Sequence, residues 1–160
     1  MRGMRHGICR AEKGQMTITD QHYMHYAKVI AEHSNDLSRK TGCVIVNTAT
    51  DDVIALGYNE FPTGVVDRIE RRQRPAKYAF TEHAERRAIY ACAKVGVSLQ
   101  GCTVYLNWYP CADCARALVA VGSKRLVCYE PDWAEERYGF VDARTILEEG
   151  GVDVTFMVRM

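Results

Sequence analysis

The second half of the chain alternates strand-forming runs with helix-forming runs, and this alternation narrows the possible folds more than any other feature. Apolar runs rich in β-branched residues predict strands over 102–107, 125–129 and 152–158. Helical spacing predicts helices between them, over 111–121 and 142–149. Strands joined through helices favour parallel pairing, with the helices covering the faces of the sheet.

The first half of the chain adds two helices, a hairpin and a long loop. The two helices are predicted over 17–35 and 79–95. The two strands of the hairpin are predicted over 42–47 and 53–58. Thr19 or Asp20 is the expected cap of the first helix. The segment 59–78 is broken by prolines and crowded with arginines, and a loop this long is usually functional or disordered. The complete order of elements predicts an α/β fold.

The overall composition restricts the compartment and the partners. With 160 residues, 48% of them hydrophobic, we expect one domain over 16–160 after a flexible tail over 1–15. A formal net charge of +1 argues against a broad basic surface for long nucleic acids. No apolar run suits a membrane span, and the tail lacks an apolar signal core. Seven cysteines at irregular spacing do not indicate a disulfide framework, so we expect a reducing, cytoplasmic location.

Two short motifs carry recognisable chemistry. The first is His83-Ala84-Glu85, and the second is Pro110-Cys111-Ala112-Asp113-Cys114. Each lies near the start of a predicted helix. Together, in this order, they match the zinc deaminase signature of His-x-Glu followed by Pro-Cys-x-x-Cys.

These residue types suit hydrolytic deamination with Zn²⁺ as cofactor. A catalytic zinc takes three protein ligands and leaves a fourth position open, and His83, Cys111 and Cys114 supply the three. Helix N-termini favour thiolates, and zinc lowers the pKa of a bound water towards neutrality. Glu85 lies two residues after His83, where it can move a proton from the water to the ring nitrogen and the leaving amine.

Two other uses of the same residues are less consistent with the sequence. A structural zinc site needs a fourth ligand, and the chain contains no second Cys-x-x-Cys pair. A redox Cys-x-x-Cys pair leaves His83 and Glu85 without a role. The remaining cysteines and one histidine pair are expected to hold no metal: Cys9, Cys43, Cys92, Cys102, Cys128, His22 and His25.

Longer matches around the motifs resemble the deoxycytidylate (dCMP) deaminase family. The run Gly57-Tyr58-Asn59-Glu60-Phe61-Pro62-Thr63-Gly64 resembles a family loop, and Lys77-Tyr78-Ala79-Phe80 resembles the run before its His-Ala-Glu motif. The segments 114–118 and 121–125 resemble the family's helix and turn after the second cysteine. The resemblance covers roughly 38–154. It implies a three-layer α/β/α cytidine deaminase-like fold, with a five-stranded mixed sheet whose last two strands are parallel.

The resemblance also implies substrate contacts and an assembly. Asn59 would hydrogen-bond the sugar, the loop 61–64 would lie near sugar and phosphate, and the backbone at 109–110 would meet the exocyclic amine. Family members are usually oligomers, so we expect a dimer or hexamer, and some are regulated by deoxynucleoside triphosphates. From the residues alone, Arg39, Lys40 and the arginines of 68–74 are candidates for holding a phosphate or for a solvated charged surface. The expected substrate-binding set is Arg39, Asn59, Phe61, Thr63, Gly64, Tyr78, Ala84, Trp108, Tyr109 and Pro110.

We therefore expect a hydrolase that cleaves a C–N bond of a cyclic amidine, converting dCMP to dUMP and ammonia in pyrimidine nucleotide metabolism. Three features depart from the family: the bulky pair Trp108-Tyr109, Glu60 in place of glycine, and an aromatic segment over 131–140. These departures leave open a substrate with another amine-bearing ring, such as a free base, a pterin or a modified pyrimidine nucleotide. A nucleic-acid editor, which the near-neutral charge disfavours, and a non-catalytic zinc module are the remaining alternatives.

Overall fold

The computed structural model describes residues 17–159. Four longer helices occur in this range: α1 (Ile18–Ala31), α3 (Ala84–Val95), α4 (Ala112–Ala120) and α5 (Phe140–Glu149). The strands are β1 (Gly42–Val46), β2 (Val53–Tyr58), β3 (Thr103–Leu106), β4 (Arg125–Tyr129) and β5 (Asp153–Met157). Three short helical segments are η1 (Ile69–Arg72), α2 (Lys77–Phe80) and η2 (Glu136–Tyr138). The tail predicted over 1–15 lies outside the described residues. None of the helices within 17–159 is long and apolar enough to cross a membrane.

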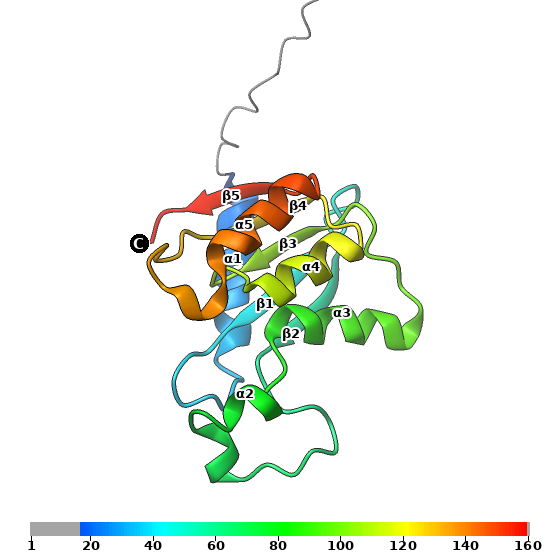
Figure 1. Cartoon of the computed structure of the whole chain (residues 1–160). Coiled ribbons are helices and arrows are strands. Elements are labelled where there is room, and N and C mark those ends of the chain that lie inside the picture. The colour runs from blue at the N-terminus through cyan, green and yellow to red at the C-terminus, as the bar shows by residue number, and fades with distance from the viewer. Residues whose placement is uncertain (1–16, 160) are drawn as a thin grey trace, which may run out of the picture.

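The five strands form one sheet in the order β2-β1-β3-β4-β5 (Figure 1). β1 pairs antiparallel with both β2 and β3, whereas β3, β4 and β5 run parallel. The crossovers between the parallel strands pass through α4 and α5. The structure thus confirms the predicted five-stranded mixed sheet with its last two strands parallel.

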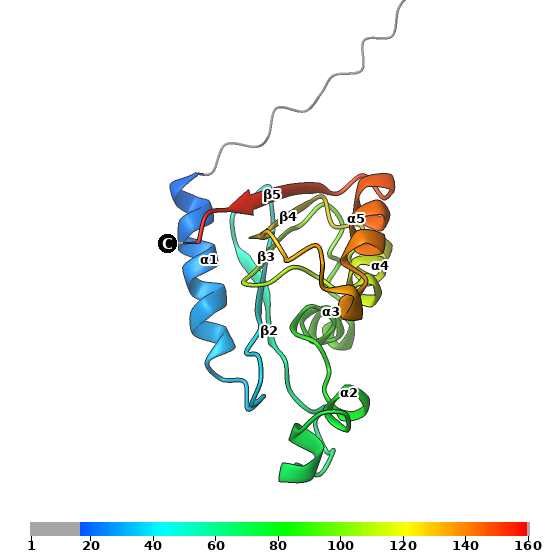
Figure 2. The ribbon, with the colours of Figure 1, turned by 60° about the vertical axis from the view of Figure 1, so that its left-hand side comes forward.

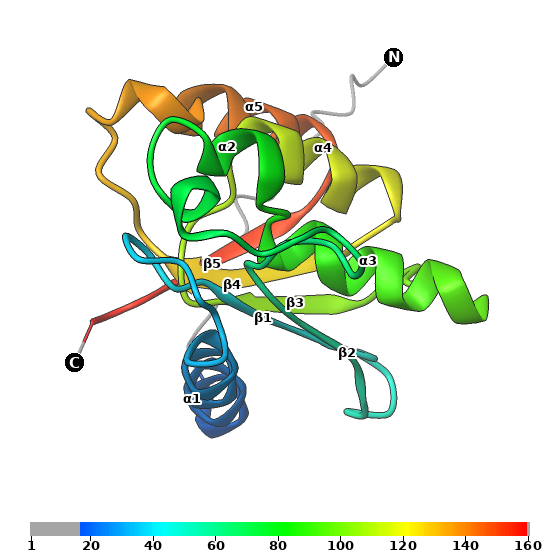
Figure 3. The same cartoon turned by 90° about the horizontal axis from the view of Figure 1, so that it is seen from below.

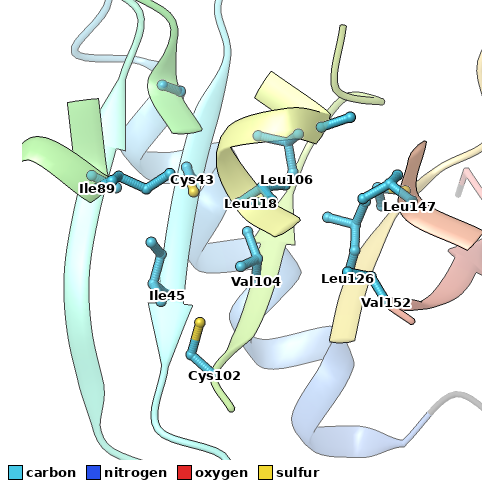
Figure 4. Close-up of a cluster of buried hydrophobic side chains, with 14 of the residues drawn as sticks. Cys43, Ile45, Ile89, Cys102, Val104, Leu106, Leu118, Leu126, Leu147 and Val152 are labelled. Atoms are coloured by element: carbon cyan, nitrogen blue, oxygen red, sulfur yellow. The ribbon is translucent and has the colours of Figure 1, made fainter. Parts of the chain in front are cut away.

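Helices cover both faces of this sheet, so the predicted three-layer α/β/α arrangement is confirmed. α1 packs on one face over a cluster that includes Met24 and Val44. α3, α4 and α5 cover the opposite face (Figures 2 and 3). There Ile89 of α3 and Leu118 of α4 join the larger core cluster, which continues over the strands (Figure 4). Because both faces are covered, every residue of the interior strand β1 is buried.

Two glycines allow helices to lie directly on the strands. A Cβ atom on Gly57 of β2 would lie 2.1 Å from the backbone oxygen of Ala84, the first residue of α3. A Cβ atom on Gly42 of β1 would lie 2.0 Å from the backbone oxygen of Ala27 in α1. Only glycine permits so close an approach of two backbones. The contact at Gly57 fixes the start of α3 against the sheet.

The start of α3 differs from the prediction. The helix predicted over 79–95 is interrupted, because Glu60 and Glu82 exchange two backbone hydrogen bonds of 3.1 and 2.8 Å. This bridge holds the chain extended just before His83. α2 therefore ends at Phe80, α3 begins at Ala84, and His83 becomes the N-cap of α3.

The first helix and the long loop also differ from the prediction. α1 ends at Ala31, and its N-cap is Thr17 rather than Thr19 or Asp20. Thr17 and Asp20 bond each other's backbone N–H groups, so Asp20 is the second half of a capping box. The segment predicted as a loop over 59–78 contains η1 and the start of α2. This segment extends below the sheet in Figures 1 and 2.

Three chain segments meet at one end of the sheet. Because β1 and β3 are antiparallel, the start of β1 lies beside the end of β3. Asn107, after β3, accepts the N–H of Gly42 at 2.9 Å and donates to the carbonyl of Lys40 at 3.2 Å. Asn59, after β2, donates its backbone N–H to the carbonyl of Thr41 at 3.1 Å. The segments before β1, after β2 and after β3 therefore lie together.

Candidate metal centre and active site

The three predicted metal ligands come together where two helices begin. His83 is the N-cap of α3, Cys111 is the N-cap of α4, and Cys114 lies in the first turn of α4. The Nδ1 atom of His83 lies 3.5 Å from the Sγ atom of Cys111 and 3.5 Å from the Sγ atom of Cys114. All three ligand atoms lie within 4.8 Å of one another.

The spacing of these atoms fits a tetrahedral zinc ion. With Zn–S bonds of about 2.3 Å and Zn–N bonds of about 2.0 Å, tetrahedral angles place sulfur and nitrogen roughly 3.5 Å apart. Both N···S separations have this value, 3.5 Å. Two thiols and one imidazole are also donors that zinc prefers. No fourth His, Cys, Asp or Glu within residues 17–159 joins the group, which leaves one tetrahedral position open.

The two thiols differ in acidity. Cys111 accepts a hydrogen bond from the S–H of Cys114, and this bond, together with His83, outweighs burial and lowers the pKa of Cys111 to about 4. The same hydrogen bond and burial raise the pKa of Cys114. The hydrogen bond to Cys111 raises the pKa of His83. The N-terminus of α4 further favours a thiolate at Cys111.

Glu85 lies beside the ligand group without belonging to it. It stands in the first turn of α3 and is only 3% exposed. Burial raises the pKa of its carboxyl group, although His83 opposes the rise. Glu85 and His83 line the same pocket. The arrangement therefore places a buried proton acceptor at the edge of a metal site with one open position.

The pocket in front of Glu85 and His83 encloses about 580 Å³ of empty space when its open mouth is included. Its walls come from the segments before β1, after β2 and after β3, together with α2, α3 and the residues around the start of α5. Six of the predicted substrate-binding residues line it: Arg39, Asn59, Tyr78, Ala84, Trp108 and Tyr109.

The other predicted substrate-binding residues do not line this pocket. Phe61 lines a smaller neighbouring pocket that shares Asp36, Asn59 and Thr81 with it. Pro110 is fully buried. Thr63 and Gly64 are exposed on the segment below the sheet. The substrate contacts expected of these four residues stay predictions.

Sequence reasoning missed six residues that line the pocket. They are Asp36, Thr41, Lys77, Thr81, Tyr138 and Phe140. Lys77 belongs to the family-like run before the His-Ala-Glu motif, and the two aromatic residues belong to the aromatic segment 131–140. The sequence analysis had therefore singled out both stretches, although not these residues. No sequence feature indicated a role for Asp36, because its partner Lys77 lies 41 residues away in the chain.

The side-chain amide of Asn59 is already engaged with the protein. Its Oδ1 accepts the N–H of Thr41 at 2.7 Å. Its Nδ2 donates to Asp36 at 3.1 Å and to the carbonyl of Arg39 at 2.9 Å. Both amide N–H groups are used, so a sugar hydroxyl can only donate to the second lone pair on Oδ1.

Arg39 and Trp108 form a stacked pair in the pocket wall. The guanidinium carbon of Arg39 lies 3.8 Å from the ring centre of Trp108 and 5.2 Å from that of Tyr138. The indole N–H of Trp108 is buried and has no acceptor in the described part of the protein. A buried donor without a partner costs free energy that a ligand oxygen can recover.

The other phosphate candidates are engaged elsewhere or exposed. Lys40 pairs with Glu32 at 3.1 Å. Arg72 pairs with Asp67, and Arg71 donates to a backbone carbonyl at 2.9 Å. None of the arginines of 68–74 lines the pocket of Glu85. Arg39 is thus the phosphate candidate that lies in the pocket.

Among the described residues, the histidines and cysteines expected to hold no metal do not belong to the ligand group. His22 and His25 are exposed, and neither belongs to a group of potential ligands within residues 17–159. The remaining described cysteines are buried free thiols: Cys43, Cys92, Cys102 and Cys128. Cys9 lies outside the described residues.

Comparison with known proteins gives the same family from sequence. A family model described as the cytidine and deoxycytidylate deaminase zinc-binding region matches residues 17–130. Mouse deoxycytidylate deaminase is 32% identical over 113 residues, which cover 67% of this chain and 62% of the mouse protein. A protein of Aliivibrio fischeri, named as an uncharacterized deaminase in the luxG 3′ region, is 29% identical over 140 residues, covering 84% of this chain and 90% of that protein.

A solved structure has a similar fold. The dCMP deaminase of cyanophage S-TIM5, in complex with dCMP and dUMP, matches with a TM-score of 0.73 and 25% identity. The match covers 89% of this chain and 100% of the cyanophage chain. Since the family model spans most of the chain and includes all three ligands, this protein belongs to the cytidine and deoxycytidylate deaminase family, whose members are hydrolytic deaminases.

Proposed function

We propose that this chain is a zinc-dependent dCMP deaminase, which converts dCMP and water to dUMP and ammonia. The observation that carries the proposal is the cluster of His83, Cys111 and Cys114. Within it, His83 lines a pocket that also holds buried Glu85 and stacked Arg39. A deaminase of nucleotides needs these parts together: a metal with one free position, a proton carrier, and a cation for the phosphate.

The three ligands would hold zinc through one nitrogen and two sulfurs. When bound, zinc would supply Lewis-acid activation of the attacking water. Cys111 suits this role because the N-terminus of α4 favours its thiolate form. A bound zinc would favour the thiolate form of Cys114 as well. His83 presents Nδ1 to both sulfurs, so this nitrogen would be its ligand atom.

Glu85 would carry the protons of the reaction. Its carboxylate accepts a proton from the water whose oxygen bonds to C4 of the cytosine ring. Glu85 then delivers this proton to ring nitrogen N3. It next takes the second proton from the new C4 hydroxyl and passes it to the exocyclic amine, so that C4=O forms, the C4–N4 bond breaks and ammonia leaves. The sum is the addition of one water and the loss of one ammonia. The 3% exposure of Glu85 keeps bulk water away from this exchange.

The pocket walls suit a nucleotide with a small base. Trp108, Tyr109 and Tyr138 offer aromatic surface against which a base can pack. Arg39 offers a planar guanidinium, which suits the oxygens of a phosphate. The dCMP and dUMP bound by the structurally similar cyanophage enzyme support this substrate class for the present chain.

A substrate panel tests the proposal. We expect ammonia release from dCMP with a kcat/KM at least tenfold above that of deoxycytidine, cytidine, cytosine, guanine or a pterin, measured by a coupled ammonia assay. Turnover of a free base or a pterin without turnover of dCMP would instead support the alternative that the bulky Trp108-Tyr109 pair suggested. Release from a single-stranded oligonucleotide alone would favour a nucleic-acid editor.

We also infer a single domain over 16–160 and a homo-oligomer, a dimer or a hexamer, acting in the cytoplasm. Light scattering coupled to size-exclusion chromatography measures the assembly directly, since each chain adds 18.1 kDa. A monomer at micromolar concentration would contradict the oligomer.

A further inference from the structure

A buried ion pair forms part of the pocket wall. Nζ of Lys77, the first residue of α2, lies 2.8 and 2.6 Å from the two carboxylate oxygens of Asp36. The side chains are 8% and 4% exposed, respectively. Lys77 also donates to the hydroxyl of Ser38 at 2.7 Å. Both charges therefore lie out of water, and each depends on the other for neutralisation.

Asp36 also organises the segment before β1. Its carboxylate accepts the backbone N–H of Ser38 at 2.8 Å and that of Arg39 at 3.1 Å. It accepts the amide of Asn59 at 3.1 Å as well. These bonds, with Lys77, lower the pKa of Asp36 although burial opposes the change. The group is thus a permanent negative charge in the wall of the pocket.

Arg39 has no acidic partner among the described residues. Within residues 17–159 its guanidinium forms no ion pair and no side-chain hydrogen bond, and it stacks instead on Trp108 at 3.8 Å. Arg39 and Lys77 are the arginine and lysine side chains of this pocket. Arg159 approaches the same indole ring at 5.0 Å but does not line the pocket.

These contacts set up a competition between the two cations. Arg39 lies three residues after Asp36, and its own N–H already bonds to that carboxylate. If Lys77 lost its charge, the buried carboxylate would need another cation, and Arg39 is the one that shares its pocket. We propose that Lys77 neutralises Asp36 so that Arg39 stays free to bind an anionic group of the substrate. Lys77 is then a specificity-determining residue, an inference that rests on the proposed function.

The first test is Lys77→Met, which removes the charge but keeps an extended side chain. We expect kcat/KM for dCMP to fall roughly 10- to 100-fold, the size of one lost hydrogen bond to a charged group. The loss should appear mainly in KM. Deoxycytidine has no phosphate, so its kcat/KM should fall much less than that of dCMP. The control is Arg144→Met, which removes one exposed cation that pairs with Glu148 and does not line the pocket, and which should leave both substrates unaffected.

The double variant Asp36→Asn/Lys77→Met separates this inference from a merely structural role. It removes both buried charges, so nothing draws Arg39 away from Trp108, and the preference for dCMP over deoxycytidine should return to within about fivefold of wild type. A double variant that has lost the preference as fully as Lys77→Met, or more fully, would overturn the proposal. If Lys77→Met does not fold, the preference of the double variant alone decides.

A crystal structure of Lys77→Met gives a readout that does not depend on the substrate. We expect the guanidinium of Arg39 within hydrogen-bond distance of Asp36 and away from the indole ring. Arg39 still stacked on Trp108 beside an unpartnered Asp36 would overturn the inference. Wild-type protein that releases no ammonia from dCMP would instead contradict the proposed function, while this structure still decides the competition between the two cations.

Discussion

The Nδ1 atom of His83 lies 3.5 Å from the Sγ atom of Cys114, although 31 residues separate them in the chain. The start of α3 and the start of α4 meet beside the end of β3, and each carries part of the ligand trio. The proposed zinc site therefore depends on how two helix starts are held on the sheet, and variants on both sides of it test the proposal.

Replacing one sulfur should weaken zinc binding. We expect Cys114→Ser to lose zinc to a chelator at least tenfold faster than wild type, because a hydroxyl is a far weaker zinc ligand than a thiolate. Metal analysis after timed dialysis against the chelator measures the loss. Cys102→Ala is the matched control, since that thiol is also buried but lies outside the ligand group. Equal zinc retention by Cys114→Ser and wild type would contradict the assignment.

Glu85→Gln should separate metal binding from catalysis. The amide keeps the size of the side chain but cannot take a proton, so kcat should fall by about 10² to 10⁴-fold. Zinc content should stay at the wild-type level, because Glu85 is not in the ligand group. Glu148→Gln, on the exposed side of α5, should keep full activity. A Glu85→Gln variant with normal turnover would favour a non-catalytic zinc module.

The ion pair between Asp20 and Arg125 should make folding sensitive to acid. Asp20 is 1% exposed, and burial alone would raise its pKa. Hydrogen bonds from Arg125 at 2.7 and 3.0 Å, and from Tyr105 at 3.0 Å, outweigh burial and lower that pKa to about 2.

The folded pKa of Asp20 lies below its unfolded value, so the pair stabilises the protein above about pH 4 and ceases to do so as pH falls through about 2. We expect Asp20→Asn to lower the free energy of unfolding by roughly 2 kcal/mol at pH 7. The difference from wild type should shrink below pH 3.8 in urea titrations. Glu32→Gln, in an exposed pair, should change stability by less than about 0.5 kcal/mol. A difference that does not depend on pH would contradict this account.

Gly57→Ala should disturb the metal site from a distance. The new methyl group would lie 2.1 Å from the carbonyl oxygen of Ala84, so α3 has to move away from β2. We expect a loss of stability of about 3 kcal/mol or more, together with faster release of zinc, because His83 caps the displaced helix. Calorimetry and the chelator assay measure the two effects. A variant with wild-type stability would show that the backbone contact is not needed.

The order of strands and helices was predictable, because periodicity is a local property of the chain. The ligand trio was predictable for a similar reason: zinc chemistry restricts which residue types can serve and how closely a Cys-x-x-Cys pair must be spaced. The break before α3 was not predictable, since it depends on the bridge between Glu60 and Glu82, whose partners lie 22 residues apart. The helical spacing of the sequence runs through the residues just before His83. In the structure the bridge to Glu60, after the end of β2, keeps those residues extended.

In the substrate pocket, too, residue types were predictable from the sequence, whereas the contacts between them were not. Arg39 and Trp108 were candidates because of their side-chain types, but their stacking depends on how β1 and β3 lie side by side. Asp36 was an ordinary loop aspartate in the sequence and became a buried partner of Lys77 only when α2 folded against that loop.

The sequence by itself determined the alternating elements, the candidate metal ligands and the carboxylate beside them, because local periodicity and ligand chemistry depend on residue types and short spacings. Only the tertiary structure decided which charges are paired in the pocket, and that Arg39 has no acidic partner within residues 17–159. The physical reason is that the free energy of a charge depends on its burial and its partners, and both are set by residues far away in the chain.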